Sequence, residues 1–206
     1  IKSGDYPLVR PIVATYTSAP TSSLVTDLFD FAATDDAQNQ LMEAGFISYQ
    51  ASAQDGAEKN ARLSQLLGAA LDGAQRTAAA QMFQILFDAD RLSPTMTGGA
   101  ASGSEGAWNR AMLQSVIAAM RDPANAGREI IFVGVGESTA GSQAAIDASV
   151  AAAADMQASL SAEAAGVIAA GNFTLSSYGF GNVSSATCID GQVAGPEYTR
   201  VEVWIR

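Results

Sequence analysis

The last part of the chain, residues 127–206, contains the pattern that most limits the fold. A short, β-branched apolar run at Ile130–Val135 precedes a long alanine-rich segment. A second strand-like run, Phe173–Gly179, and an alternating tail, Tyr198–Arg206, follow it. A continuous apolar run of this kind is typical of a strand covered on both faces, whereas strict alternation predicts a half-covered strand. We therefore expect a β-α-β unit and a final strand in one sheet.

Helical periodicity surrounds these strands. The longest predicted helix runs over residues 143–165, with Gly166 as its C-terminal cap. Its expected inward face consists of Ile146, Val150, Ala153, Leu160 and Ala164. An earlier helix, ended by Pro123 and Gly127, has its apolar positions at Trp108, Met112, Val116, Ile117 and Met120. Residues 98–106 and 182–195 are expected to form loops.

The first half of the chain shows weaker signals. Residues 7–17 and 46–49 are compatible with strands, and residues 51–80 with a connecting helix. Between them we expect a helix with an apolar stripe at Leu24, Leu28, Phe31 and Ala32. A second helix, capped near Thr34-Asp35-Asp36 and ended by Gly45, is expected to turn Leu41, Met42 and Ala44 inward.

Composition excludes several classes of function. The 206 residues carry a formal net charge of −10 and include no histidine. Nucleic acid is therefore not an expected partner, because phosphate binding needs clustered Lys and Arg. Histidine-dependent triads and imidazole metal sites are excluded, and the lone Cys188, expected to be a small buried residue, forms no internal disulfide. No transmembrane segment or signal peptide is predicted, and the opening residues indicate a fragment of a longer protein.

The C-terminal region resembles the peptidoglycan-associating domain of the OmpA-like family. The resemblance covers about residues 90–206 and is carried by Val133-Gly-Val-Gly-Glu-Ser138, Tyr178-Gly-Phe-Gly181, Cys188-x-Asp190 and the tail Arg200–Arg206. It implies an α+β fold over residues 81–206, a β/α/β/α/β-β sandwich with helices on a mixed sheet, whose first strand would begin at residues 91–97. It also implies a cell-envelope protein in the periplasm or at the outer membrane of a Gram-negative bacterium.

Residues 1–50 resemble the end of a PstS-type periplasmic phosphate-binding protein. The matching pieces are Tyr6-Pro-Leu-x-Arg10-Pro, two predicted helices, and Ala44-Gly-Phe46. This resemblance implies an N-terminal α/β segment like the end of a type 2 periplasmic binding domain. It carries over no ligand residue, because the phosphate-contacting motifs of that family lie in parts that do not match this chain.

The OmpA-like resemblance implies where a ligand would bind. In that family an acid and a helical Arg grip the diaminopimelate of peptidoglycan, since Arg offers a bidentate fork and the acid pairs with an ammonium. Glu137 occupies the acid position, but the Arg position falls on Ala152 or Ala153. Losing such a partner typically costs about 1.5–3 kcal/mol. We therefore expect a degenerate, weak peptidoglycan site at Glu137, Ser138, Gly141 and Arg200.

No catalytic, metal or cofactor site is predicted. Ser138, Ser142 and Ser149 have neither a histidine nor a nearby lysine as base, and Asp35-Asp36 is read as helix-capping sequence. The sequence favours a noncatalytic envelope protein that binds peptidoglycan weakly or contacts another envelope protein. Two alternatives stay open: a structural or assembly subunit that reuses the scaffold, with self-association, and part of a phosphate- or solute-binding envelope protein.

Overall fold

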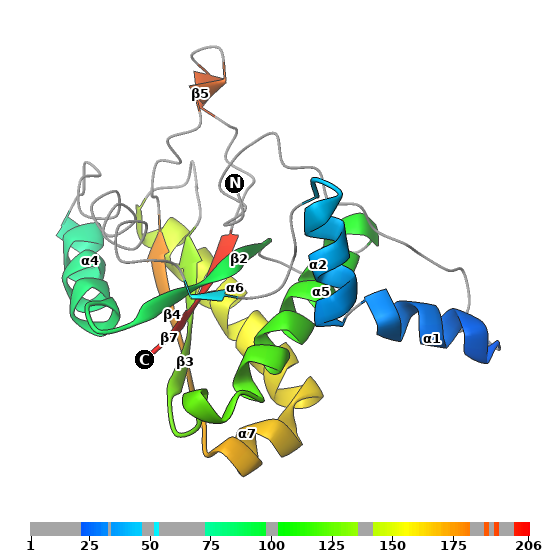
Figure 1. Ribbon diagram of the computed structural model, residues 1–206. Coiled ribbons are helices and arrows are strands. Elements are labelled where there is room, and N and C mark those ends of the chain that lie inside the picture. The colour runs from blue at the N-terminus through cyan, green and yellow to red at the C-terminus, as the bar shows by residue number, and fades with distance from the viewer. Residues whose placement is uncertain are drawn as a thin grey trace.

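The protein is a mixed α+β protein, as the sequence predicts (Figure 1). The computed structural model describes residues 22–32, 34–46, 52–53, 73–97, 103–135, 142–181, 188–189, 192–193 and 200–206. Its helices are α1 (Ser23–Ala32), α2 (Asp35–Glu43), α4 (Gly73–Leu86), α5 (Gly103–Met120), the 3₁₀ helix η1 (Pro123–Asn125), α6 (Ser142–Glu163) and α7 (Ala165–Gly171). Its strands are β1 (Ser52–Ala53), β2 (Asp90–Thr97), β3 (Glu129–Val135), β4 (Thr174–Gly181), β5 (Cys188–Ile189), β6 (Gln192–Val193) and β7 (Arg200–Ile205).

The main sheet has five strands in the order β1-β2-β7-β3-β4. β3 and β4 are parallel and are joined through α6 and α7, which confirms the predicted β-α-β unit. The last strand, β7, lies between β2 and β3 and is antiparallel to both. The C-terminal tail therefore forms an inner strand of the sheet and not an outer one, and it links the β-α-β unit to β2.

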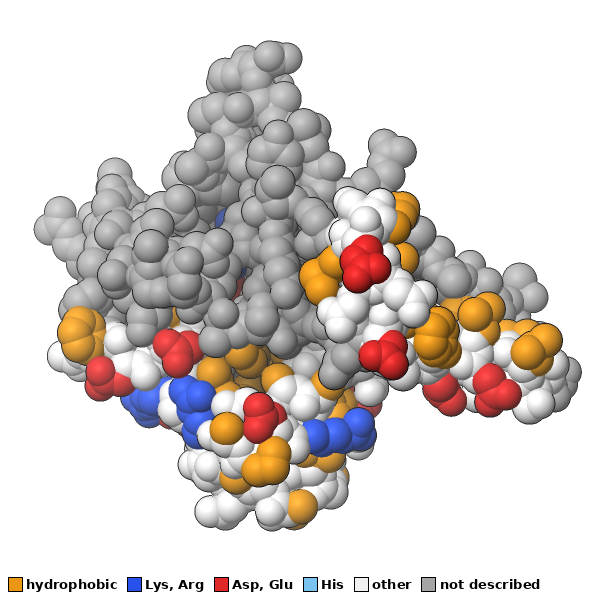
Figure 2. Space-filling model, in the orientation of Figure 1, with side chains coloured by type: hydrophobic (Ala, Val, Ile, Leu, Met, Phe, Trp, Pro, Cys, Tyr) orange, Lys and Arg blue, Asp and Glu red, His pale blue; other side chains and the backbone are white. Residues whose placement is uncertain are grey.

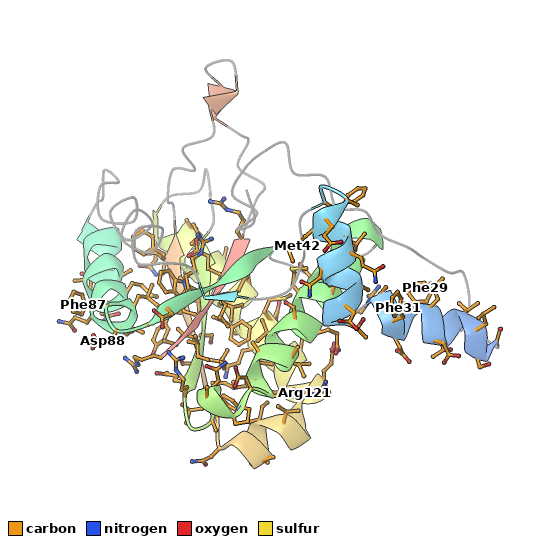
Figure 3. The ribbon with its side chains drawn as sticks, viewed as in Figure 1. Phe29, Phe31, Met42, Phe87, Asp88 and Arg121 are labelled. Atoms are coloured by element: carbon orange, nitrogen blue, oxygen red, sulfur yellow. The ribbon has the colours of Figure 1, made fainter. Side chains whose placement is uncertain are left out.

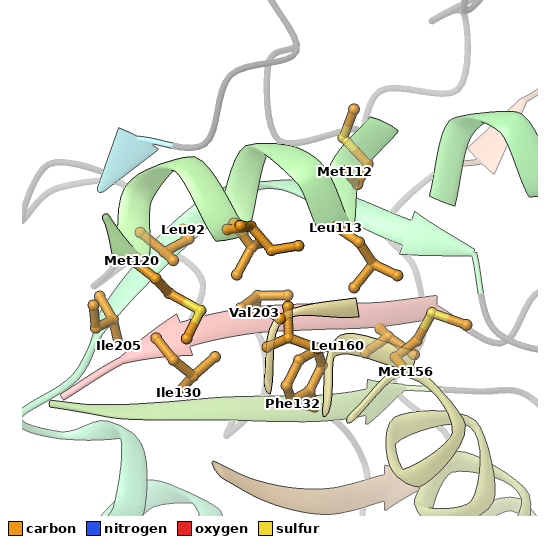
Figure 4. Close-up of a cluster of buried hydrophobic side chains, with 14 of the residues drawn as sticks. Leu92, Met112, Leu113, Met120, Ile130, Phe132, Met156, Leu160, Val203 and Ile205 are labelled. Atoms are coloured by element: carbon orange, nitrogen blue, oxygen red, sulfur yellow. The ribbon is translucent and has the colours of Figure 1, made fainter. Parts of the chain in front are cut away.

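Helices cover both faces of this sheet. On one face, α5, α6 and α7 enclose a core that includes Phe132, Val203 and Leu160 (Figure 4). On the other face, α4 packs over Ile131, Val133 and Trp204. Consecutive residues of β3 therefore enter different cores, and the strand is buried from Ile130 to Val135. The expected double coverage of this strand is confirmed.

The prediction of a half-covered last strand is wrong. Glu202 and Trp204 alternate with the valines of β7, yet both are buried beneath α4. The Glu202 carboxylate lies 3.5 Å from Nε of buried Arg91 and accepts a 3.2 Å hydrogen bond from Trp204 Nε1. A charge can be enclosed in this way because a paired, hydrogen-bonded carboxylate avoids most of the cost of isolated burial. The polar half of the alternation consequently faces a second core.

The long helix also differs from its predicted form. α6 ends at Glu163, the buried Ala164 interrupts it, and α7 begins at the next residue, so Gly166 lies inside a helix instead of capping one. The break redirects the chain so that Val167 and Ile168 of α7 pack against the core. The left-handed cap is Asn172, whose φ is 52° and whose N–H donates to carbonyls of α7. Val150 is exposed, contrary to its predicted inward position.

The loop predictions are corrected in two places. α5 begins at Gly103, so residues 103–106 are helical, while residues 98–102 lie outside the described part. β5 and β6 pair inside the segment expected to be one long loop. Ladders of two residues are too short to give a periodic signal. The sequence of the apolar run 82–87 fits either a helix end or a strand; its residues 82–86 end α4, and Phe87 lies in the turn that follows. β2 matches the strand that the resemblance implies at residues 91–97.

The N-terminal helices form where the sequence predicts, but their apolar sides do not face a core. The Thr34 side chain accepts from Ala37 N to cap α2, and Gly45 ends it at a φ of 88°. The stripe of α1 is exposed, as are Leu41 and Met42 of α2 and its C-terminal cap residue Ala44. Among the described side chains of α2, Ala37 and Gln38 are instead the buried ones. The strand expected at 7–17, residues 47–49 of the strand expected at 46–49, and residues 51 and 54–72 of the helix expected at 51–80 lie outside the described residues. Within that expected helix, Ser52–Ala53 form β1 instead, and residues 73–80 belong to α4.

Candidate ligand site at the ends of β3 and β4

Four strand ends meet at one edge of the sheet, where edge means the line along which strands begin or end and not an outer strand. The parallel strands β3 and β4 finish together, with Val135 opposite Gly181. β7 begins at the same edge, where Arg200 pairs with Val135 on one side and with Thr97 of β2 on the other. The carboxyl ends of parallel strands are a common location for ligands in α/β sheets. This edge is therefore the place where a site built from residues 136–141 and Arg200 would lie.

Two strand glycines let α6 lie directly against this part of the sheet. A Cβ added at Gly134 would lie 1.8 Å from the carbonyl oxygen of Ser149, and one at Gly179 would lie 2.5 Å from Ser149 Oγ. Neither strand position accepts a side chain without moving the helix. The glycines thus fix the distance between α6 and the ends of β3 and β4.

Ser149 fastens the helix to the strand end. Its hydroxyl donates to the carbonyl of Ile146 at 2.8 Å and accepts from the backbone N–H of Gly181 at 3.0 Å. Gly181 has a φ of 77°, which suits glycine at the irregularity that ends the β3–β4 ladder. Sequence reasoning treated Ser149 only as a rejected nucleophile. The signal that it missed was the glycine on each strand, which indicates a close backbone approach.

The structure places only one of the four predicted site residues. Glu137, Ser138 and Gly141 lie outside the described residues, although Val135 brings the chain to within two positions of Glu137. Arg200 is half-buried at the edge of the sheet. Side chains alternate between faces along a strand, so Arg200 shares the face of Glu202 and Trp204, which α4 covers. It does not share the face on which α6 lies.

The two helix positions on which the OmpA-like resemblance would place an Arg, Ala152 and Ala153, belong to the core. Ala152 is 6% exposed and Ala153 is fully buried, and both pack in the cluster that contains Phe132 and Met156. No Lys or Arg occurs in the sequence of α6. The face of α6 that meets β3 therefore supplies close packing and no cation to the sheet edge.

Two further charged contacts of the sheet are structural. At the opposite edge, Arg128 approaches Asp90 at 3.4 Å and donates to the carbonyl of Ile205 at 3.2 Å. Arg206 forms an ion pair with Glu129 there. These pairs connect the ends of β2, β3 and β7, so they hold the strands together rather than presenting charge to a ligand.

Figure 2 shows acidic and apolar side chains over α1 and α2 and the blue basic side chains farther down the same face. Within the described ranges, no group of three or more His, Cys, Asp or Glu residues is arranged to hold a metal ion. None of the helices that the structure describes is long and apolar enough to cross a membrane. The described residues at this edge therefore include no group that could hold a metal ion.

Comparison with known proteins adds no assignment: no family model matches the chain, and no curated protein matches its sequence.

Proposed function

We propose that this chain is a noncatalytic cell-envelope protein, periplasmic or associated with the outer membrane, whose OmpA-like domain has a degenerate peptidoglycan site. The observation that supports this best is the path of the chain, β2-α5-β3-α6-β4-β7, through a sheet ordered β2-β7-β3-β4. This is a β/α/β/α/β-β arrangement with helices on a mixed sheet, which the sequence resemblance implies. The resemblance also places the ligand at the edge where β3 and β4 end.

The packing of α6 supports weak rather than strong binding. A carboxylate ligand at this edge would need a cation from the α6 face, and Ala152 and Ala153 offer only methyl groups there. Arg200 reaches the edge from the face that α4 covers. The acid at Glu137 alone would attract the ligand's ammonium and repel its carboxylates.

Sedimentation with purified peptidoglycan sacculi tests this proposal. The chain is expected to stay in the supernatant, like an unrelated acidic protein, while a family member with the usual Asp and Arg is retained. Retention equal to that family member would refute the degenerate site.

A restored guanidinium tests the position more sharply. Ala152 is 6% exposed and Ala153 is fully buried, so Ala152→Arg is the variant of the two that needs the smaller rearrangement of the core. If the position is correct, retention rises about tenfold, the usual effect of one charge-assisted partner. Ala151→Arg adds the same charge one residue away on the exposed side of α6 and is expected to change nothing. Equal retention of the two folded variants, verified by thermal melts, would show that the Arg position is misassigned.

A structural or assembly role is the second candidate, and exposed apolar side chains favour it. Leu28 and Phe31 of α1 and Leu41 and Met42 of α2 are large apolar residues left in solvent. Contiguous exposed apolar surface commonly marks an interaction site. Light scattering during gel filtration distinguishes the forms of this role, because self-association raises the mass with concentration and a heteromeric role does not.

A further inference from the structure

The helix α1 presents an apolar row that the described structure leaves uncovered. Leu24, Leu28 and Phe31 follow one another at spacings of four and three residues and are 75%, 62% and 49% exposed. None of the ten residues of α1 is buried. In Figure 1 the helix lies to the right of the body, away from the sheet. A helix with so strong an apolar side normally stands against another surface, because its stability depends on burying that side.

An acidic row runs beside the apolar one. Asp27 is three residues after Leu24 and four before Phe31, so it lies next to both on the helix surface. Asp30 is one turn farther along, and both carboxylates are exposed. The sequences of α1 and α2 contain no Lys or Arg, and on the face in Figure 2 their surface is orange and red without blue.

We propose that α1 is a docking surface for an amphipathic helical segment of another protein whose apolar stripe is flanked by Lys or Arg. Such a segment would cover Leu24, Leu28 and Phe31 and set its cations against Asp27 and Asp30. Charge complementarity beside an apolar stripe is the usual way in which helices select a partner. The inference does not depend on peptidoglycan binding, since α1 is not part of the edge where β3 and β4 end.

The charges argue against two other occupants. A second copy of this chain would bring an acidic row against an acidic row, and like charges placed together oppose association. Bacterial membrane surfaces and other anionic bilayers would repel the same row, whereas membrane-surface helices carry Lys and Arg beside their apolar face. A basic, amphipathic protein segment satisfies both rows at once.

Fluorescence anisotropy with two labelled synthetic peptides provides the test. Both peptides are helical with one leucine stripe, which is flanked by lysines in the first and by glutamates in the second. The 206-residue chain is expected to bind the lysine peptide at least about tenfold more tightly, and added salt is expected to reduce that preference. Equal affinity for the two peptides, or binding of neither, would overturn the proposal.

Matched variants locate the binding. Leu28→Asp places a charge in the apolar row and is expected to weaken lysine-peptide binding about tenfold or more. Phe87→Asp adds the same charge at a 60% exposed aromatic residue that lies on the other side of the molecule from Phe31 in Figure 3, and should leave binding unchanged. The double variant Asp27→Lys, Asp30→Lys should transfer the preference to the glutamate peptide. Similar losses in Leu28→Asp and Phe87→Asp would mean that the peptide binds elsewhere.

Three further measurements identify the other occupants, each of which would overturn the proposal. A Leu28-dependent dimer in light scattering would make the occupant a second copy. Leu28-dependent sedimentation with phosphatidylcholine vesicles, with or without phosphatidylglycerol, would make it a bilayer. Slow maleimide labelling of Leu28→Cys in a Cys188→Ser background would show that this chain itself covers the row; rapid labelling is expected.

Discussion

Replacing Gly134 with alanine tests how closely α6 lies against the sheet. The new Cβ would lie 1.8 Å from the carbonyl oxygen of Ser149 and 2.6 Å from its carbonyl carbon. An ordinary contact requires more than about 3.3 Å, so the helix backbone must retreat by about 1.5 Å. Because the obstacle is backbone and not a flexible side chain, no rotamer change relieves it.

The expected cost follows from this displacement. Overpacking a core costs about 1–3 kcal/mol, and the upper end applies where backbone must move. Retreat of α6 also breaks the 3.0 Å bond from Gly181 N to Ser149 Oγ, which adds about 1 kcal/mol. The free energy of unfolding should therefore fall by about 3–4 kcal/mol. For a chain of this size that corresponds to a Tm lower by about 6–16 °C.

Thermal and urea unfolding followed by circular dichroism measure this change. Gly166→Ala is the matched control, because a Cβ there meets nothing within 4 Å and the residue lies inside α7. Alanine should stabilise that helix by about 0.5–1 kcal/mol. Gly→Ala should therefore raise the free energy of unfolding at position 166 and lower it at position 134. If Gly134→Ala unfolds at the wild-type temperature or above it, the close approach of α6 to β3 is wrong.

Three other changes probe the contacts around this frame. Glu202→Gln should lower the free energy of unfolding by about 3–5 kcal/mol in urea titrations, because it leaves the buried Arg91 beside a neutral group. The double variant Glu202→Leu, Arg91→Met should recover most of that loss. No recovery would mean that the lost stability does not come from the ion pair. Ser149→Ala should cost about 1–3 kcal/mol, since Gly181 N loses its acceptor, and a neutral result would mean that this bond contributes nothing. Asn172→Gly should raise the melting temperature slightly, because glycine adopts the φ of 52° without a steric penalty, whereas a lower Tm would show that the Asn side chain matters there.

Several local signals in the sequence predict the structure correctly. The β-branched run of β3 has no polar face, so it fits only a strand enclosed on both sides. The spacing of Met112, Val116 and Met120 places them on one side of α5, which faces the core. The Thr34 cap and the Gly45 terminus of α2 depend on hydrogen bonds and dihedral angles within a few residues.

The candidate site was less predictable. Strand periodicity places Arg200 in the last strand, but the strand that lies beside it, and the helix on each face, depend on pairing between distant segments. The resemblance indicated Ala152 and Ala153 as the positions without a cation, and only the packing shows them inside the helix–sheet core. The role of Ser149 was missed because its acceptor function depends on Gly181, which is 32 residues away.

The sequence by itself determined the approximate positions of α1, α2, α6, β3, β4 and β7, because those preferences arise from neighbours one to four residues apart. It also determined that no imidazole chemistry is available and that α6 carries no cation. Only the tertiary structure decided that the C-terminal strand enters the middle of the sheet and that Glu202 is buried against Arg91. The physical reason is that a strand's pairing partners and the coverage of its second face are set by contacts between segments distant in the chain. The alternation in β7 shows two faces but does not show that α4 covers the polar one.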